Sequence, residues 1–328
     1  MSKPTPFGSQ STADDVLAGL NLSGRTILIT GCNAGIGFET FRALAHHGAH
    51  VIGLARNLQA ARDACQRAGG SSSAVACDLA DLDSVIEATR TVRRLDRPLD
   101  AIVASAGIMG TTELQVRDGV ELQFLVNHVG HFALINGLID LVPDHNGRVV
   151  IVSSSGSIQQ APKQGILFDN LDGHRFYKPF TFYGQSKLAC ALFAKELSRR
   201  LAPRGIVVNS LHPGAVGGTG LNRGLGFPLT AILAVARHFM KSIPQGAATQ
   251  TLLAASPLVD GISGEYWVDC RIGKGSPHLN DRAMAERLWT ITEKIVATHV
   301  HPRRREDGTP IEHRQQVCDP NLASNDCA

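Results

Sequence analysis

The chain has 328 residues, of which 43% are hydrophobic and 19% are charged, so it can bury a sizeable core and is not a disordered chain. Lys and Arg number 32 against 29 Asp and Glu, a net charge of +3, which gives no case for a nucleic-acid or membrane-surface partner. Seven widely spaced cysteines without a CxxC pair indicate reduced thiols in a cytoplasmic protein rather than disulfides or a zinc site.

The N-terminal residues 1–22 are predicted to form an arm, because Met1–Gln10 is polar and lacks the apolar segment of a secretory signal. Thr12 is the predicted cap of a short helix that runs through Ala18. The longest mostly apolar stretch, Phe227–Phe239, is well short of the ~20 residues that a membrane span needs. We therefore expect no membrane span.

From Arg25 to Asp269, short apolar runs alternate with helical patterns. The predicted strands are Thr26–Thr30, His50–Leu54, Ala74–Ala76, Ala101–Ala104, Arg148–Ser153, Ile206–Leu211 and Glu265–Val268. The predicted helices are Ile36–His47, Leu58–Ala68, Leu82–Leu95, Gly119–Leu141, Phe182–Leu201 and Asp281–Thr298. This alternation predicts a single α/β domain over 23–298, built on a doubly wound parallel sheet of about seven strands with helices on both faces. The tail, 299–328, is predicted to be disordered.

A glycine-rich turn joins the first predicted strand to the first predicted helix. Gly31, Gly35 and Gly37 leave no side chains where a phosphate would approach the backbone, and the helix that starts near Ile36 directs its free N–H groups there. The spacing, Gly-x-x-x-Gly-x-Gly, differs from Gly-x-Gly-x-x-Gly and, without a following Gly-Lys-Ser/Thr, from a P-loop. The position favours a dinucleotide site over a plain strand–helix turn.

The end of the second strand bears on the choice of cofactor. Ala55 and Arg56 stand where an NAD-specific site has a carboxylate for the ribose hydroxyls. An arginine here suits a 2′-phosphate, so we expect NADP(H) to be favoured over NAD(H); a surface arginine that opens a helix is the alternative. Asp78, after the third strand, is predicted either to bind the adenine amino group or to cap the next helix.

Tyr183 and Lys187 are four residues apart in a helical stretch and therefore share one helix face. The lysine charge favours the phenolate form of the tyrosine, which suits a group that exchanges a proton with a substrate oxygen. The serines of Val152-Ser-Ser-Ser-Gly156 follow the fifth strand, where a hydroxyl can bind a developing oxyanion or simply end the strand. No Gly-x-Ser-x-Gly elbow surrounds them, which disfavours a hydrolase nucleophile.

Together, Thr30-Gly-x-x-x-Gly-Ile-Gly37, Asn127, the serine triplet and Tyr183-x-x-x-Lys187 resemble the ordered motifs of short-chain dehydrogenases/reductases. The resemblance covers about residues 23–298 and is closest to the retinol-dehydrogenase-like branch. That branch is indicated by Val126-Asn-His-Val-Gly-His-Phe132, Phe182-Tyr-Gly-Gln-Ser-Lys-Leu188, Asn209-Ser-Leu-His-Pro-Gly214 and Leu288-Trp289. The family implies a Rossmann fold and an NAD(P)-dependent oxidoreductase that acts on CH–OH groups.

The resemblance also implies a role for each matched residue. Tyr183 is the general acid/base, Lys187 favours its phenolate and holds the ribose hydroxyls, and Asn127 holds a water in a proton relay through Lys187. Ser154 orients the substrate, with Ser153 and Ser155 as close competitors. The implied cofactor-binding residues are Gly31, Asn33, Gly35, Ile36, Gly37, Arg56, Asp78, Leu79, Ser105, Ala106, Gly107, Asn127, Tyr183, Lys187, Pro213, Gly214, Val216 and Thr219. Ser105 replaces an asparagine of the family and has a shorter reach, so we expect weaker support of the sheet there.

Two further patterns concern histidines and the substrate side. His46-His47-x-x-His50 spans a helix end and the next strand, so its rings cannot share one helix face and no metal site is expected. His128 and His131 are expected to pack or lie at the surface rather than transfer protons. The apolar segment 217–244 is predicted to be a lid over a hydrophobic pocket, with a dimer contact or ordinary core as an equal alternative. The insertion Ser157–Lys178 is a candidate second wall.

The predicted function is NADP-dependent interconversion of a small hydrophobic alcohol and its carbonyl, in a cytoplasmic protein for which homo-oligomer formation is left open. A non-catalytic NADP-binding regulatory or scaffold protein of the same fold is the alternative. A sugar-nucleotide epimerase or dehydratase uses the same Tyr–Lys pair. It usually shows a Gly-x-x-Gly-x-x-Gly turn and a larger C-terminal substrate domain, neither of which the sequence shows.

Overall fold

The middle layer of the fold is one sheet of eight strands in the order β10-β9-β8-β7-β4-β1-β2-β3. The computed structural model describes residues 5–217 and 240–300. The strands are β1 (Thr26–Thr30), β2 (His50–Ala55), β3 (Ser72–Ala76), β4 (Ala101–Ala104), β7 (Arg148–Val152), β8 (Val207–His212), β9 (Tyr266–Val268) and β10 (Arg271–Ile272). All neighbours pair in parallel except β9 and β10. The predicted parallel sheet is confirmed, and β10 is an unpredicted antiparallel addition.

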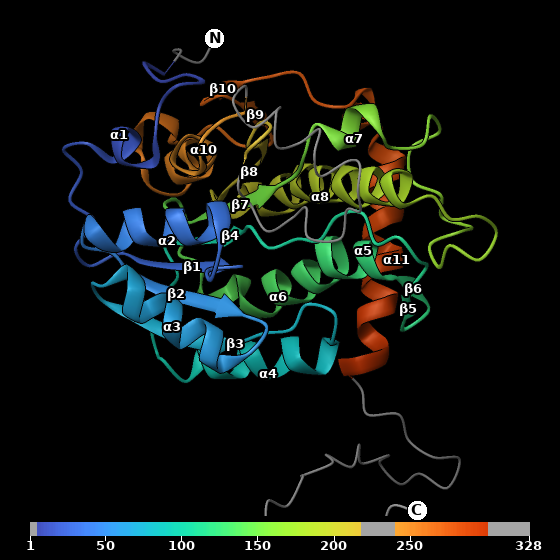
Figure 1. Ribbon diagram of the computed structural model, residues 1–328, viewed down its shortest axis with the longest axis horizontal. Helices are drawn as coiled ribbons and strands as arrows, with labels where there is room; N and C mark the ends of the chain where they lie inside the picture. Colours follow the sequence, from blue (N-terminus) through green and yellow to red (C-terminus); the bar gives the residue numbers. More distant parts are fainter. Residues whose placement is uncertain (1–4, 218–239, 301–328) are drawn as a thin grey trace, which may run out of the picture.

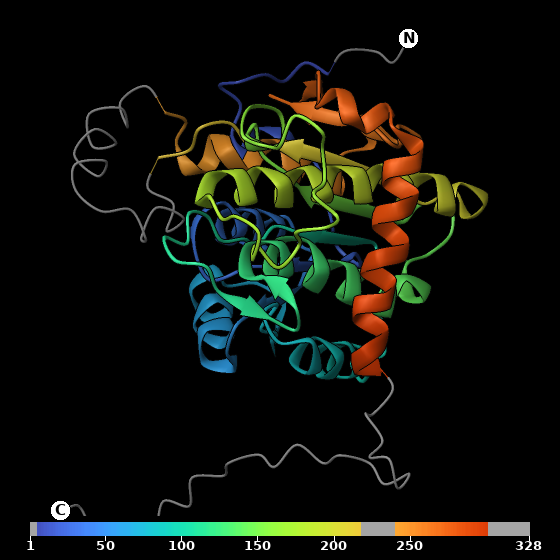
Figure 2. The same cartoon turned by 90° about the vertical axis from the view of Figure 1, so that its right-hand side faces the viewer.

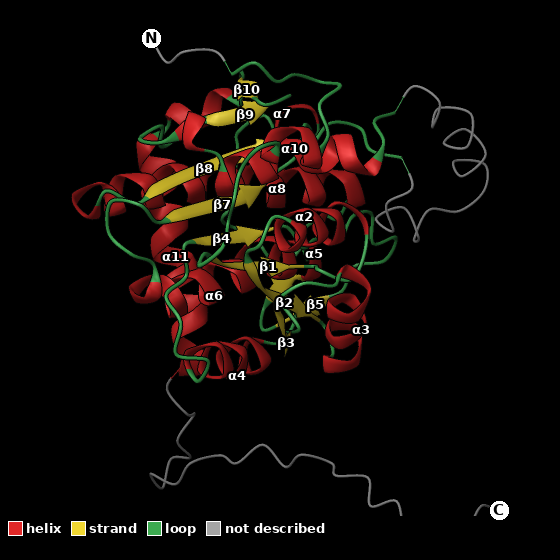
Figure 3. Cartoon of the chain, turned by 90° about the vertical axis from the view of Figure 1, so that its left-hand side faces the viewer, coloured by secondary structure: helices red, strands yellow, loops and turns green. Residues whose placement is uncertain are grey.

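Helices cover both faces of this sheet (Figure 1, Figure 3). One face carries α1 (Ala13–Leu17), α2 (Gly35–His46), α3 (Leu58–Ala68) and α10 (Ile243–Ala255), and the other carries α4 (Leu82–Arg93), α5 (Leu122–Phe124), α6 (Gly130–Leu138), α8 (Pro179–Leu201) and α11 (Arg282–Val300). The helix α11 crosses α8 and reaches α4 (Figure 2). The predicted doubly wound arrangement with two covered faces is therefore confirmed.

Successive strand residues point into two separate cores. Leu28 of β1 belongs to the core under α4, α6 and α8, whereas Ile27 and Ile29 belong to the core under α2, α3 and α10. All three are buried. Because both faces need apolar side chains, the strands are continuous hydrophobic runs rather than alternating ones, and this is what made them recognisable in the sequence.

The chain reverses its direction across the sheet between β1 and β4. It passes outward through β2 and β3 and then returns to place β4 on the other side of β1. In an open parallel sheet, the connections on the two sides of such a point leave in opposite directions, so a crevice forms outside the carboxyl ends of the strands. This crevice holds the site described below.

The predicted helix Gly119–Leu141 is wrong in its first residues. They form a hairpin instead, in which β5 (Val116–Arg117) pairs with β6 (Val120–Glu121). Asp118 and Gly119 both have positive φ, 53° and 72°, the conformation that an Asp-Gly turn between two strands adopts. The helix begins at Leu122 and includes a π-helical turn, Leu125–Val129, before α6.

The short helix predicted after Thr12 is present as α1. It has a capping box between Thr12 and Asp15 and packs on α10 and α2. The helix α10 itself was not predicted and begins after the cap residue Ser242, so the last residues of the predicted lid belong to a helix. Residues 218–239, most of that lid, and the tail from residue 301 lie outside the described residues.

Within the described residues, one helical stretch, Leu122–Leu141, is long and apolar enough to cross a membrane. Of its most apolar window, 67% is buried inside the protein, and its side chains line the core between the sheet and α8. Burial of this kind is typical of a core helix, which has the same composition as a membrane span because it is surrounded by apolar neighbours.

Gly130, at the start of α6, lies where this helix approaches the loop after β3 closely enough to leave no room for a side chain. A Cβ at this position would lie 2.5 Å from the Leu79 carbonyl oxygen, a backbone atom that cannot move aside. Gly130→Ala is expected to lower the free energy of unfolding by about 1–3 kcal/mol despite the better helix propensity of alanine. Urea unfolding measures the change.

The matched control is Asn136→Ala, on the same helix. Within the described residues, its half-buried side chain bonds only to the Phe132 carbonyl, so a change within about 0.5 kcal/mol is expected. Equal stability of the Gly130→Ala and Asn136→Ala variants would contradict the close contact.

Candidate active site

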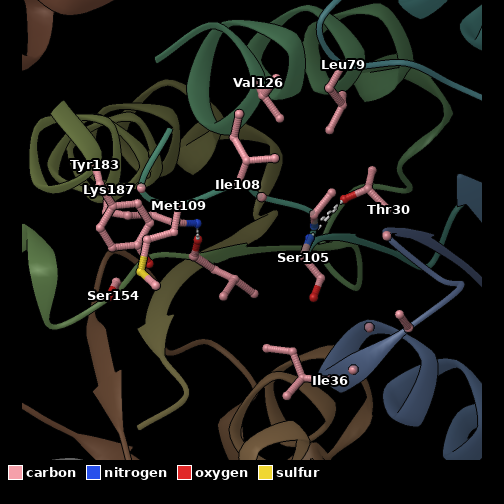
Figure 4. A pocket seen from close by; sticks show the side chains of 18 of the residues that line it. Thr30, Ile36, Leu79, Ser105, Ile108, Met109, Val126, Ser154, Tyr183 and Lys187 are labelled. Atoms are coloured by element: carbon pink, nitrogen blue, oxygen red, sulfur yellow. Dashed lines mark hydrogen bonds between the residues drawn. The ribbon is translucent and has the colours of Figure 1, made fainter. Parts of the chain in front are cut away.

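A cavity of about 1150 Å³ lies along the carboxyl ends of the strands, above the switch point. All but two of the residues predicted for the site line it: Gly31, Asn33, Gly35, Ile36, Gly37, Arg56, Asp78, Leu79, Ser105, Ala106, Gly107, Ser154, Tyr183, Lys187, Pro213, Gly214 and Val216. Asn127 is buried behind the wall, and Thr219 lies outside the described residues. Figure 4 shows Tyr183, Lys187 and Ser154 grouped at one side of the cavity, with Thr30 and Ser105 towards the other.

The glycine-rich turn is packed too tightly for side chains. A Cβ at Gly37 would lie 2.4 Å from the Gly31 carbonyl oxygen, and one at Gly31, whose φ is +70°, would lie 3.0 Å from the Ala106 Cα. The helix α2 begins immediately after the turn and has no side-chain cap. Its first N–H groups, at Gly35 and Ile36, therefore face the cavity, as the binding of a pyrophosphate requires.

The Thr30 hydroxyl joins β1 to β4 at the floor of the cavity. It accepts hydrogen bonds from the Ser105 and Ala106 N–H groups, both at 3.0 Å. It also lies 2.9 Å from His131 Nε2. A hydroxyl has one proton and two acceptor sites, so with both acceptor sites used Thr30 must donate to His131. The short side chain of Ser105 was expected to support the sheet weakly. The Ser105 N–H group supports it instead, through its bond to Thr30. The Ser105 hydroxyl donates to Gln250 at 3.2 Å.

His131 passes this hydrogen-bond chain on to Asn127. With Nε2 accepting from Thr30, the proton of the neutral ring is on Nδ1, which donates to the Asn127 carbonyl at 2.9 Å. Burial lowers the pKa of His131 to about 4, so the ring is neutral near pH 7. His131 therefore packs in the core, as the sequence favours, and also links Thr30 to Asn127 by hydrogen bonds.

Asn127 sits in the π-helical turn and is held by several hydrogen bonds. Its side chain accepts from the Ile108 N–H at 2.8 Å and donates to the Ile108 carbonyl at 3.0 Å and to Ser186 at 2.9 Å. Its carbonyl accepts from His131 and, at 3.0 Å, from Cys190. This geometry clamps the loop after β4, and the water relay expected of Asn127 stays a prediction.

Tyr183 and Lys187 both project from α8 towards the cavity. The helix starts with Pro179 in its first turn, a position where proline costs no hydrogen bond. Lys187 is buried and donates to the Val152 carbonyl at 3.0 Å, which fixes the ammonium group beside the end of β7. Among the described residues, nothing hydrogen-bonds to the Tyr183 hydroxyl, so that group remains available to a ligand.

The three serines after β7 have different hydrogen-bond partners. Ser153 is buried and donates to the Lys187 carbonyl at 2.7 Å. Ser154 accepts from the Gly156 N–H at 3.1 Å, which leaves its own proton free for an oxygen in the cavity. The geometry therefore favours Ser154 over Ser153 as the substrate-orienting serine.

Tyr266 of β9 supports Ser154 from below and was not predicted. Its hydroxyl donates to the Ser154 carbonyl at 3.1 Å, and its ring stacks on His212, with 6.4 Å between the ring centroids. Burial raises the pKa of Tyr266, so the hydroxyl keeps the proton that this bond needs.

A second unpredicted cluster holds the loop after Met109, which lines the cavity. Gln123 accepts from the Gly110 N–H at 2.8 Å and donates to the Pro179 carbonyl at 3.1 Å and to Glu121 at 3.1 Å. Burial raises the pKa of Glu121. Tyr177, in the insertion that was predicted as a wall, donates to the Thr111 carbonyl at 2.6 Å. The signal for this cluster in the sequence was the polar pair Glu121 and Gln123 at the start of an otherwise apolar stretch.

The charges around the cavity favour an anionic ligand. Its described lining includes Arg56, Arg117 and Lys187 but only one carboxylate, Asp78. Asp78 accepts from the Ala80 N–H at 3.0 Å, whereas Asp81 caps α4. The capping role that the sequence left open for Asp78 therefore belongs to Asp81.

The histidine run near the second strand does not converge. His46 contacts the Ala68 carbonyl, His47 contacts the Ala43 carbonyl, and His50 contacts Ser71 and Ser73. Over residues 5–217 and 240–300, no group of three or more histidine, cysteine or acidic side chains is placed to hold a metal ion.

Comparison with known proteins agrees with this site. Residues 25–166 match the family model of short chain dehydrogenases. The chain is 36% identical over 303 residues to the chloroplastic short-chain dehydrogenase TIC 32 B of Brassica napus, covering 88% of this chain and 94% of that protein. It is 37% identical over 295 residues to retinol dehydrogenase 14 of Mus musculus, covering 84% and 86%.

Solved structures give the same result. A protein of Mycobacterium paratuberculosis has a TM-score of 0.69 and 31% identity, covering 87% of this chain and 97% of that one. A short chain dehydrogenase of Burkholderia cenocepacia in complex with NADP has a TM-score of 0.61 and 25% identity, covering 76% and 98%. The chain belongs to the short-chain dehydrogenase/reductase family and is an oxidoreductase of CH–OH groups.

The Thr30 hydroxyl can be tested with two variants. Thr30→Val keeps the shape but leaves two half-buried N–H groups and His131 Nε2 unpaired, whereas Thr30→Ser keeps the hydroxyl. We expect the valine variant to have a free energy of unfolding about 2–4 kcal/mol below that of the serine variant. Chemical denaturation of both measures the difference, and equal stabilities would show that the Thr30 hydroxyl does not hold β1 to β4.

Proposed function

We propose that the chain is an NADP(H)-dependent oxidoreductase that interconverts a small hydrophobic alcohol and its carbonyl, with Tyr183 as general acid/base. The observation that carries the proposal is the meeting of Tyr183, Lys187 and Ser154 in one cavity with the uncapped start of α2. The likeness to retinol dehydrogenase 14 supports an alcohol or carbonyl as substrate. The five described cysteines are free thiols, in keeping with the cytoplasmic placement that forms part of the proposal.

The residues present fit a nicotinamide dinucleotide. The glycine turn leaves space at the backbone for a pyrophosphate, and Gly214 and Val216 border the cavity beyond β8. Arg56 is an exposed cation on the cavity wall after β2, which suits a 2′-phosphate. The NADP complex of the Burkholderia relative supports that choice. When bound, the cofactor donates a hydride to the carbonyl carbon in its reduced form, or accepts one from the alcohol carbon in its oxidised form.

The protein's own part in the reaction is proton transfer at the substrate oxygen. Tyr183 offers its hydroxyl to that oxygen, and Lys187, four residues further along the same helix face, lines the cavity with it. Ser154, with its proton free, binds the same oxygen and holds it in place. Met109, Phe180 and Met240 give this part of the cavity an apolar wall, which suits a hydrophobic substrate.

Replacing Tyr183 with phenylalanine removes one oxygen atom and tests the proton transfer. We expect turnover of ketones and aldehydes with NADPH to fall by about 10²–10⁴, while the NADPH affinity, measured by fluorescence titration, changes far less. Turnover within about tenfold of the unmodified protein would contradict the role of Tyr183. Cofactor binding without turnover of any carbonyl by the unmodified protein would favour the regulatory or scaffold alternative.

The cofactor preference depends on Arg56. A charge-assisted hydrogen bond contributes roughly 1.5–3 kcal/mol, or about 10–150-fold in affinity. Arg56→Ala is therefore expected to weaken NADP(H) binding by that factor relative to NAD(H). Addition of Ala55→Asp should reverse the preference further, because a carboxylate repels the phosphate and binds the ribose hydroxyls.

The control for this prediction is Arg62→Ala. Arg62 is an exposed residue of α3 that does not line the cavity, so its removal changes the net charge equally without removing a contact. Michaelis constants for NADP and NAD, measured in the four proteins, give the answer. Equal constants in the unmodified protein, or an Arg56→Ala variant that keeps its preference, would contradict the assignment.

A further inference from the structure

The side-chain amide of Gln160 is an unused polar group at the catalytic end of the cavity. Gln160 follows α7 (Gly156–Gln159) and lines the cavity. Its Oε1 atom is buried and has no hydrogen-bond partner within the described part of the chain. Buried polar atoms in folded proteins are nearly always paired, so an unpaired oxygen in a residue that lines the cavity points to a partner that comes from the ligand.

Two glycines fix this amide beside Tyr183. A Cβ at Gly184 would lie 2.4 Å from the Gln160 carbonyl carbon, so the backbone at Gln160 packs directly on the catalytic helix α8. A Cβ at Gly156 would lie 3.0 Å from Gln160 Oε1 and also 3.0 Å from Tyr183 Cε1. The amide oxygen and the edge of the tyrosine ring are thus no more than about 6 Å apart.

The backbone around Gln160 is held as well. The Gln160 and Ala161 N–H groups both donate to the Gly156 carbonyl, at 2.9 and 3.1 Å. The backbone that carries the amide is therefore held close to the reaction centre before any ligand binds, so little backbone entropy is lost when the amide forms a hydrogen bond.

Resting on the proposed oxidoreductase function, we propose that Gln160 determines specificity by accepting a hydrogen bond from a hydroxyl group adjacent to the reacting carbon. The substrates of this class are α-hydroxy ketones and the corresponding vicinal diols with a hydrophobic body. The second hydroxyl lies near the reacting one because Gln160 Oε1 lies beside the ring of Tyr183. Met109, Phe180 and Met240 receive the apolar remainder.

The energetic consequence is selective. A ligand hydroxyl pairs the buried oxygen, whereas a methyl group in its place leaves that oxygen desolvated and unpaired. Sites built to bind a hydroxyl reject analogues without it far more strongly than hydrophobic pockets reject an extra methylene. The protein is therefore expected to discriminate between two compounds that differ only in this hydroxyl group.

The test uses 2-hydroxyacetophenone and propiophenone, in which a methyl replaces the hydroxyl at nearly equal size. We expect the unmodified protein to have a kcat/KM at least about tenfold higher for the hydroxy ketone. Gln160→Leu, which keeps the size of the side chain, should lower that value about tenfold and leave propiophenone unchanged. Gln159→Leu is the matched control, because Gln159 is exposed and does not line the cavity.

The outcomes separate this inference from the proposed function. Turnover of both ketones with the same ratio in the unmodified and Gln160→Leu proteins would overturn the role of Gln160 and leave the oxidoreductase function intact. If neither ketone is turned over, their dissociation constants from the NADPH-loaded protein, read by NADPH fluorescence, replace the kinetic ratio. A preference for the hydroxy ketone that Gln160→Leu removes and Gln159→Leu keeps supports the inference, and equal affinities overturn it.

Discussion

The Thr30 hydroxyl is the interaction on which the arrangement of the site depends. It accepts two N–H groups from the end of β4 and donates to His131, so each of its hydrogen-bonding positions is used. Through His131 the same group fixes the Asn127 carbonyl, and Asn127 in turn clamps the loop after β4. Two strands and one helix are thus held at the switch point by a single oxygen atom, directly below the cavity.

The fold was predictable to the extent that burial on both faces shapes the sequence. Parallel strands covered by helices are continuous apolar runs, and all seven predicted strands are present. Two of the missed features have little apolar pattern: β10 has only two residues, both exposed, and the hairpin before α5 has two residues in each strand. The Asp118-Gly119 turn was the one local signal for that hairpin, and the apolar run that follows it extended the predicted helix across it.

The candidate site was predictable for a different reason. Parallel strands end at the same edge of the sheet, so Gly31, Arg56 and Ser154, far apart in the sequence, were expected to meet there, and they line one cavity. The positioning residues were not predictable, because their partners come from distant segments. Tyr266 contacts a carbonyl 112 positions away, and His131 contacts Thr30 over 101 positions. A polar residue inside an apolar helix is a signal that such a partner exists but does not identify it.

The helix α8 separates the chemistry of the site from its selectivity. Its Tyr183 and Lys187 side chains face the cavity, while Gly184, the residue after Tyr183, allows the Gln160 backbone to pack on the helix itself. A larger residue at 184 would push this segment away from the tyrosine. With glycine there, the side chain at position 160 can differ without moving the catalytic pair. One rigid helix can therefore keep the same proton donor while the adjacent wall sets which substituent beside the reacting carbon is accepted.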